Sequence, residues 1–137
     1  MEQPAPYQGR TALIVDDDPD CLLQVRIYLE KMGFSVIEGA SQAEGEGLIA
    51  RSRPDLAVFD LMLEHHDSGF VLAHRLKQAH PTTPVILVTG VSAETGFRFA
   101  DTSPEERAWI KADVVLDKGI RYEQLRREVE RLLPLPS

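Results

Sequence analysis

The stretch Ala12-Leu13-Ile14-Val15-Asp16-Asp17-Asp18 places three acids directly after an apolar run. A short apolar run of this kind is typical of a buried β-strand, so the acids are expected at its carboxyl end. Neighbouring carboxylates repel one another unless a positive charge lies close to them. Because hard divalent cations prefer carboxylate oxygens, the stretch predicts a Mg²⁺ site at this strand end.

Three later apolar runs also end in polar residues. They are residues 56–59 before Asp60, residues 85–88 before Thr89, and residues 114–116 before Asp117 and Lys118. Acids, a hydroxyl and an amine at strand ends are the components of a metal-assisted phosphoryl site.

Strand-like and helix-like patterns alternate along the chain. The expected strands are Thr11–Val15, Phe34–Ile37, Asp55–Phe59, Pro84–Val88 and Val114–Leu116, and the expected helices are 19–32, 41–52, 69–79, 103–111 and 120–133. This alternation predicts an α/β fold in which helices cover both faces of a parallel sheet. Sites in such sheets lie beyond the carboxyl ends of the strands, where the polar residues fall.

Helix start signals support two of these helices. Asp18 is a candidate N-cap before Pro19, which suits the first helical position. Ser41 is a candidate N-cap with Glu44 three residues later, the spacing of a capping box.

The composition indicates one domain, which we place at residues 11–133 between short tails at residues 1–10 and 134–137. The net charge of −7 argues against a nucleic-acid partner. The first residues lack a signal-peptide pattern, and no apolar run approaches the roughly 18 residues that span a bilayer. We therefore expect a cytoplasmic protein without a membrane partner. Cys21, the single cysteine, is expected to be a small packed residue.

Four short motifs together resemble the receiver domain of two-component response regulators. They are Leu13–Asp20, Val58–Met62, Val88–Gly90 and Leu116–Lys118. The resemblance covers about residues 11–133. It implies a flavodoxin-like, CheY-like doubly wound (βα)5 fold with a five-stranded parallel sheet in the order 2-1-3-4-5.

The resemblance also implies a role for each residue of the site. Asp60 would be the phosphoacceptor, because a carboxylate can attack phosphorus when a cation offsets the charge that builds up. The Mg²⁺ ligands would be Asp17, Asp60, the backbone carbonyl of Met62 and, mostly through water, Asp16. Lys118 and Thr89 would contact the phosphoryl oxygens.

The contact of Thr89 with the phosphoryl group would act as the switch. A shift of Thr89 would change the surface formed by the expected helix 103–111, the fifth strand and the last helix. In the family an aromatic residue commonly lies three positions before Lys118, but here that residue is Val115. The same surface could form a homodimer.

A sensor histidine kinase or a histidine phosphotransfer protein would supply the phosphoryl group. Apart from its own phosphorylation and dephosphorylation, such a domain is not an enzyme. We expect a single-domain response regulator without DNA-binding output, which acts through a target protein that the sequence does not identify. The alternative is a receiver fragment of a hybrid histidine kinase or of a larger regulator.

The sequence departs from the family pattern at three places. The segment Glu64–Gly69 lacks the usual proline and is one residue longer than expected. Gly119 replaces the proline that usually follows the lysine, and the segment 90–113 is several residues longer than usual. His65-His66-Asp67 could ligate a metal, but exposed loop histidines are the simpler interpretation.

Other functions are compatible with parts of the pattern. Each site residue alone could be a helix cap, a structural acceptor or a solvated side chain. A phosphorylation-independent interaction module would usually lack one of the acids, the hydroxyl or the lysine. A phosphohydrolase of the haloacid dehalogenase type needs a second acid where Met62 stands. A flavin binder needs a phosphate-cradling loop where Asp16, Asp17 and Asp18 would repel phosphate.

Overall fold

The computed structural model describes residues 6–61, 63, 68–90 and 112–134. Strands and helices alternate from residue 11 to residue 89, as the sequence predicts, and a further strand and helix follow after residue 112. The elements are β1 (Thr11–Val15), α1 (Pro19–Met32), β2 (Ser35–Gly39), α2 (Gln42–Arg51), β3 (Leu56–Asp60), α3 (Ser68–Ala79), β4 (Val85–Thr89), β5 (Val114–Asp117) and α6 (Tyr122–Leu132). The helix expected at 103–111 lies outside the described residues.

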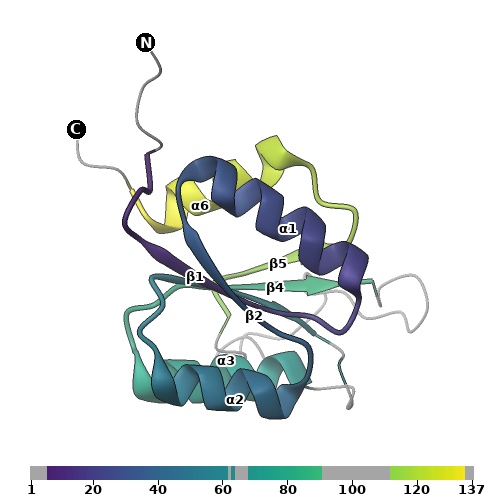
Figure 1. The fold of residues 1–137 in the computed structure, drawn as a ribbon, viewed down its shortest axis with the longest axis vertical. Helices are drawn as coiled ribbons and strands as arrows, with labels where there is room; N and C mark the ends of the chain where they lie inside the picture. The colour runs from purple at the N-terminus through teal and green to yellow at the C-terminus, as the bar shows by residue number, and fades with distance from the viewer. Residues whose placement is uncertain (1–5, 62, 64–67, 91–111, 135–137) are drawn as a thin grey trace, which may run out of the picture.

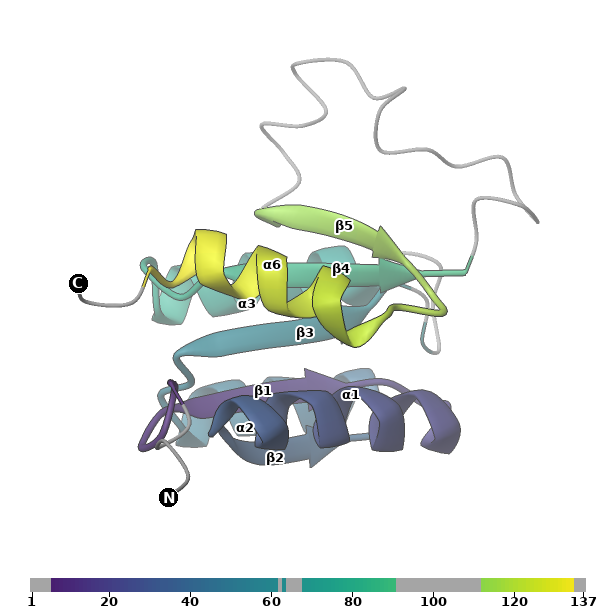
Figure 2. The ribbon, with the colours of Figure 1, turned by 90° about the horizontal axis from the view of Figure 1, so that it is seen from above.

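The five strands form one parallel sheet in the order β2-β1-β3-β4-β5, which confirms the predicted topology. The order reverses next to β1, because the chain moves outward to β2 and then returns past β1 to β3. Figure 2 shows the strands running in one direction, so their carboxyl ends share one edge of the sheet.

Helices α1 and α6 cover one face of the sheet, and α2 and α3 cover the other (Figure 1). Alternate strand residues point to opposite faces, which gives two separate apolar clusters. Ile14 and Val58 pack with Leu29 of α1 and Val129 of α6 in one cluster. Leu13, Phe59 and Leu87 pack with Leu72 and Leu76 of α3 in the other. Strands buried on both faces explain the nearly continuous apolar runs of the sequence.

The predicted helix caps form. The side chain of Asp18 accepts a hydrogen bond from the backbone N–H of Asp20, and Pro19 opens α1. The Ser41 hydroxyl accepts from the N–H of Glu44 at 3.1 Å. The Glu44 carboxylate in turn accepts from the N–H of Ala40, at 2.7 Å, one residue before the cap. These bonds satisfy N–H groups at the start of each helix.

Several element boundaries differ from the predicted ones by one to two residues. β2 begins after Phe34 and continues to Gly39, because its backbone pairs with β1 along the whole length of that strand. β3 and β4 each begin one residue later than expected and include Asp60 and Thr89. The apolar runs predict these strands, but backbone pairing continues into the polar residues that follow.

The N-terminal segment is packed as far back as Tyr7, although we expected a tail up to residue 10. Tyr7 is 1% exposed, and its ring stacks on Phe34 with centroids 5.0 Å apart. Its hydroxyl donates to the carbonyl of Leu133 at 2.7 Å, and its N–H donates to the carbonyl of Met32. One aromatic residue therefore joins the start of the chain to the ends of α1 and α6.

Among the described residues, no helix combines the length and the apolar character needed to cross a membrane.

Candidate functional site

The polar residues that follow the strands meet at the carboxyl edge of the sheet. In the parallel register Asp60 lies beside Val88, and Thr89 lies beside Asp117. The N–H of Asp16 donates to the carbonyl of Gly39 at 3.1 Å, which fixes the backbone just after β1. Side chains from four separate places in the sequence thus reach one edge.

Three carboxylates form the centre of this edge. Asp16, Asp17 and Asp60 each offer an oxygen that lies within 4.8 Å of the other two. Asp16 is 2% exposed and Asp60 is 4% exposed, while Asp17 is open to solvent. Carboxylates this close repel one another strongly when they are poorly hydrated. The arrangement is therefore stable only with positive charge beside it.

Lys118 supplies part of that positive charge. Its Nζ lies 3.3 Å from Oδ2 of Asp60 and 3.6 Å from Oδ1 of Asp16. Burial would lower the pKa of Lys118, but the negative charges of Asp60 and Asp16 outweigh it, and the pKa is raised. The side chain therefore stays an ammonium at neutral pH. One ammonium against three carboxylates leaves the cluster negative, and its oxygen donors suit a hard divalent cation.

The backbone around Lys118 holds the lysine beside Thr89. The N–H of Lys118 donates to the carbonyl of Thr89 at 2.9 Å. Gly119 adopts a φ of +87°, a left-handed conformation that glycine reaches without strain. Among the described residues no peptide bond is cis, so the turn after Lys118 forms in the trans state. Thr89 is 2% exposed at the end of β4.

Gly69 allows α3 to begin directly against the end of β3. Its N–H donates to the carbonyl of Leu61 at 2.8 Å. A Cβ at this position would lie 2.6 Å from the carbonyl oxygen of Asp60 and from the Cα of Leu61. Those atoms are backbone and cannot move aside easily. The sequence contained this glycine, but its spacing alone did not reveal the contact.

Cys21 lies near the acids without being a reactive thiol. It is half-buried on α1 and packs against the cluster beneath that helix, as predicted. Burial, followed by its hydrogen bond to Asp16 and the charge of Asp16, raises the pKa of Cys21 to about 12. The thiol therefore stays protonated at neutral pH.

Of the remaining positions named in the sequence analysis, one packs in the apolar core and the others lie outside the described residues. Val115 is partly buried on β5 and packs against the cluster under α2 and α3. The other positions named in the sequence analysis lie outside the described residues: Met62, the group His65-His66-Asp67, and the long segment between β4 and β5 except its two ends.

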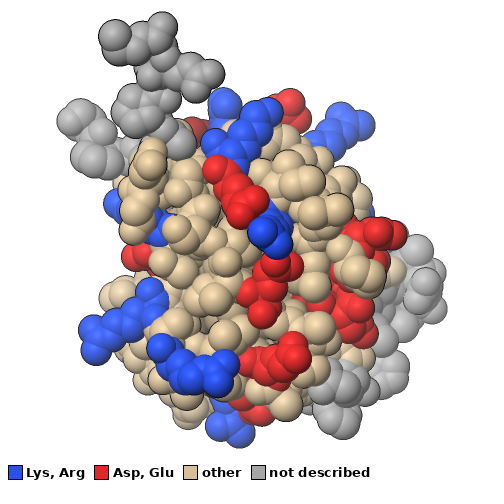
Figure 3. All heavy atoms as spheres, viewed as in Figure 1, with Lys and Arg blue, Asp and Glu red and all other residues tan. Residues whose placement is uncertain are grey.

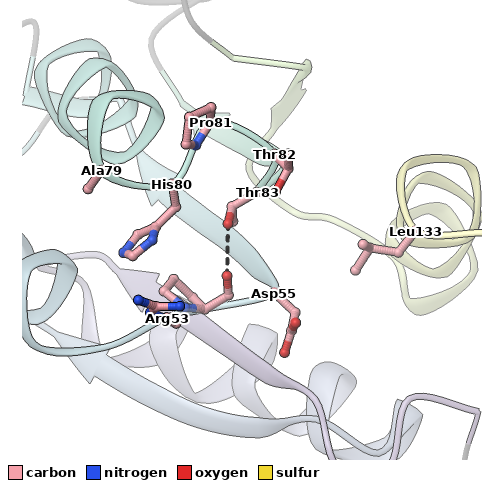
Figure 4. Close-up of a pocket in the computed structure, with 9 residues that line it drawn as sticks. Arg53, Asp55, Ala79, His80, Pro81, Thr82, Thr83 and Leu133 are labelled. Atoms are coloured by element: carbon pink, nitrogen blue, oxygen red, sulfur yellow. Dashed lines mark hydrogen bonds between the residues drawn. The ribbon is translucent and has the colours of Figure 1, made fainter.

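A pocket of about 460 Å³ lies at the opposite, amino edge of the sheet. Arg53 and Asp55 before β3, His80 and Thr83 before β4, and Leu133 after α6 contribute to its walls (Figure 4). The Thr83 hydroxyl donates across it to the carbonyl of Pro54 at 2.9 Å. Because its walls precede the strands, this pocket is separate from the carboxylates.

Comparison with protein families supplies the context for the carboxylate cluster. The model of the response regulator receiver domain matches residues 12–130. The chain belongs to the response regulator receiver family. Receiver domains are signalling domains of two-component systems, and the match covers β1 to α6.

Two curated relatives are longer proteins. The receiver chain is 36% identical over 122 residues to the transcriptional regulatory protein GlrR of Escherichia coli K12, which covers 89% of this chain and 27% of GlrR. It is 39% identical over 93 residues to the alginate biosynthesis transcriptional regulatory protein AlgB of Pseudomonas aeruginosa, covering 68% of this chain and 20% of AlgB. The chain thus spans less than a third of these curated relatives.

Solved receiver structures share the fold. A CheY-like receiver domain protein from Methanospirillum hungatei JF-1 has a TM-score of 0.71 and 27% identity, covering 90% of this chain and 93% of its own. The receiver domain of a sensor histidine kinase from Pseudomonas aeruginosa PAO1 has a TM-score of 0.73 at 20% identity, covering 90% and 97%. That second structure holds a magnesium ion in its active-site cleft.

Proposed function

We propose that this receiver domain accepts a phosphoryl group on Asp60 in a Mg²⁺-dependent reaction and thereby switches a protein-binding surface. The observation that carries the proposal is the meeting of three carboxylates with the ammonium of Lys118 at one edge of the sheet. Both Asp16 and Asp60 lie beside Lys118, and Oδ2 of Asp60 is the nearer of the two to Nζ, at 3.3 Å against 3.6 Å for Oδ1 of Asp16.

The transfer is a simple displacement at phosphorus. A carboxylate oxygen of Asp60 attacks, the bond from phosphorus to an imidazole nitrogen of the donor breaks, and that nitrogen keeps the electron pair. Lys118 offsets the negative charge that the phosphoryl oxygens bring to the cluster. Thr89 donates its hydroxyl to another phosphoryl oxygen. The net product is an acyl phosphate on Asp60.

The residues fit a Mg²⁺ ion. Asp17 and Asp60 would be its direct carboxylate ligands, Asp16 would act mostly through water, and the backbone carbonyl of Met62, a residue outside the described part of the chain, would complete the set. The ion, when bound, neutralises carboxylate charge and stabilises the charge that develops on the transferred group. The magnesium ion in the active-site cleft of the kinase receiver described above supports a Mg²⁺ site in this chain.

The partners follow from the reaction. The donor is a sensor histidine kinase or a histidine phosphotransfer protein, and the acyl phosphate alters the surface around β5 and α6. A homodimer through that surface is one outcome. Relatives named as transcriptional regulators favour a DNA-binding output elsewhere in a longer chain. The single-domain regulator without such output, predicted from sequence, stays a prediction.

Intact mass spectrometry after incubation with acetyl phosphate and Mg²⁺ tests the proposal. The wild type should gain one phosphoryl group, and Asp60→Ala should gain none. Asp117→Ala is the matched control, because Asp117 also ends a strand at this edge but is not assigned to the metal or to the transfer. That control should be labelled like the wild type.

Chelation of Mg²⁺ should abolish the adduct on the wild type. An adduct that persists on Asp60→Ala would move the phosphoacceptor to another residue. A wild type that binds Mg²⁺ but never gains the adduct would instead favour the phosphorylation-independent interaction module.

A further inference from the structure

The third acid after β1, Asp18, bonds to helix α1 and is not part of the carboxylate cluster. It is not one of the three carboxylates that lie within 4.8 Å of one another. Its Oδ1 accepts a hydrogen bond from the N–H of Asp20 at 3.0 Å, and its carbonyl accepts from the N–H of Leu22 at 3.0 Å. Asp18 is therefore the N-cap of α1, with an extended backbone at φ −93° and ψ 111°.

The backbone of Asp18 also bonds to the carboxylate cluster. Its N–H donates to Oδ1 of Asp16 at 2.9 Å, and the same Oδ1 lies 3.6 Å from Nζ of Lys118. Asp16 is 2% exposed, and a buried carboxylate is costly without its hydrogen bonds. Asp18 thus bonds to the cluster through its N–H and to α1 through its side chain and its carbonyl.

Asp17 lies between two residues whose backbone is fixed. On one side, the N–H of Asp16 donates to the carbonyl of Gly39 at 3.1 Å. On the other side, Asp18 makes the three bonds described above. Asp17 itself is exposed, and within the described part of the chain its carboxylate has no bonding partner. The direction of the Asp17 side chain therefore depends on the backbone of its two neighbours.

The charge of Asp18 does not account for these contacts. Figure 3 shows acidic side chains gathered where α1 begins, and the cluster already sets three carboxylates against the ammonium of Lys118. A further negative charge increases the repulsion between the acids. At the start of a helix, however, the oxygen of a capping side chain satisfies a backbone N–H and favours the helix. The contacts of Asp18 thus favour a capping role over a ligand role.

We propose that Asp18 is a positioning residue for the Mg²⁺ site: by capping α1 it holds Asp16 and Asp17 in the arrangement that receives the ion. This inference rests on the proposed function, because it concerns the metal site of that same reaction. Asp18 does not bind the ion. Its contribution comes from the hydrogen bond that its side chain accepts and not from its charge.

Three substitutions separate capping from charge. Asp18→Asn and Asp18→Ser remove the charge but keep an oxygen that caps a helix, whereas Asp18→Ala removes both. Calorimetric titration with Mg²⁺ measures the Kd of each variant. We expect Asp18→Ala to raise the Kd by at least about tenfold, the usual effect of losing a residue that orients a metal ligand. Asp18→Asn and Asp18→Ser should raise it by no more than about threefold at about 0.15 M salt, which screens the lost charge.

Ser41→Ala is the matched control. Ser41 caps α2 through the same kind of bond, from the N–H of Glu44 at 3.1 Å, but α2 contributes no ligand to the cluster. Both alanine variants lose one helix cap, so both should unfold at a lower urea concentration than the wild type. Only Asp18→Ala should weaken Mg²⁺ binding. The control therefore separates a loss of stability from a loss of positioning.

Amide hydrogen exchange, measured by NMR without Mg²⁺, tests the positioning in the absence of the ion. The N–H of residue 18 should exchange slowly in the wild type, Asp18→Asn and Asp18→Ser. It should exchange at least about tenfold faster in Asp18→Ala, because the first turn of α1 then opens more often. Labelling by acetyl phosphate should need about tenfold more Mg²⁺ for its half-maximal rate in Asp18→Ala, but should reach nearly the wild-type rate when Mg²⁺ is saturating.

The other outcomes are distinct. Equal Kd values for the three Asp18 variants, all well above that of the wild type, would assign the effect to charge and overturn the positioning role. An unchanged Kd in Asp18→Ala would overturn it as well, and so would an equal rise in Ser41→Ala. A wild type that binds Mg²⁺ but never gains a phosphoryl group would contradict the proposed function, while the predicted order of Kd values would still support the positioning role. A wild type that does not bind Mg²⁺ would overturn both.

Discussion

The two edges of this sheet are built from the same strands but differ in how their polar groups are paired. At the amino edge, donors meet acceptors: the Thr83 hydroxyl bonds to Pro54, the N–H of Thr11 bonds to Asp55, and the Tyr7 hydroxyl bonds to Leu133. At the carboxyl edge, three carboxylates lie within 4.8 Å of one another beside one lysine.

The difference separates stability from function. Satisfied hydrogen bonds between neighbouring turns contribute to stability and require no ligand. Converging like charges oppose folding and persist where they bind something. The amino edge contains a pocket of about 460 Å³. The carboxyl edge is the candidate site because of its charges.

The largest effect is expected at the junction between β3 and α3. Gly69→Ala places a methyl group 2.6 Å from the backbone of Asp60 and Leu61, so the start of α3 must move away. We expect a loss of about 3 kcal/mol or more in the free energy of unfolding, measured by urea denaturation. Acetyl phosphate labelling should fall as well, because the backbone of Asp60 shifts.

Gly47→Ala is the matched control on α2. A Cβ there meets only the far end of Arg51, at 3.9 Å, and the helix backbone suits alanine. This change should stabilise the protein by about 0.5–1 kcal/mol. If Gly69→Ala were as stable as the wild type, α3 could shift without any loss in the free energy of unfolding. The close contact at Gly69 would then not be needed to position the backbone of Asp60.

A second pair of variants tests whether polar groups at the two edges have opposite effects on the free energy of unfolding. Asp17→Asn should raise the free energy of unfolding without Mg²⁺ by up to about 1 kcal/mol, because it removes one of three neighbouring charges. Thr83→Val should lower it by about 1–2 kcal/mol, because it leaves the carbonyl of Pro54 without its donor. Urea denaturation in the presence and absence of Mg²⁺ measures both.

Added Mg²⁺ should stabilise the wild type and Thr83→Val alike, since ligand binding favours the folded state. It should stabilise Asp17→Asn much less. If Asp17→Asn were destabilising without Mg²⁺, the charge of Asp17 would be supporting the fold, and the proposed contrast between the edges would be incorrect.

Local patterns were sufficient to predict the sheet and the gathering of polar residues at its carboxyl edge. The apolar runs before Asp16, Asp60 and Thr89 predict buried strands, and parallel pairing brings their ends together. The family resemblance supplied the strand order, which the structure confirms. The roles of Asp60 and the metal ligands stay proposals, since proximity alone does not establish phosphoryl transfer.

Contacts between distant residues could not be predicted in this way. Tyr7 has no periodic pattern around it, so its stacking on Phe34 and its bond to Leu133 were missed. The clash that Gly69 avoids depends on the path of β3 into α3, and spacing does not encode a distance.

The smallest expected effect is a difference between the two edges in how the free energy of unfolding depends on pH. Burial and the hydrogen bond to Asp16 raise the pKa of Cys21 from 9.0 to about 12 at the carboxyl edge. At the amino edge, burial and then the charge of Glu130 raise the pKa of Tyr7 above 10.0, against the opposing charge of Arg10. Each group therefore favours the folded state below its unfolded pKa and loses that contribution as the pH rises through the shifted range.

The two pH ranges begin at different values, which makes the edges separable. Between pH 9 and 10 the unfolded chain loses the Cys21 proton while the folded protein keeps it, so the free energy of unfolding should fall. Cys21→Ala should flatten this fall, whereas Tyr7→Phe should leave it unchanged and flatten only the decline above pH 10. Urea denaturation under reducing conditions gives these slopes, and comparing slopes removes the constant cost of each substitution. If the free energy of unfolding of Cys21→Ala fell between pH 9 and 10 as steeply as that of the wild type, the thiol would not be held protonated beside Asp16.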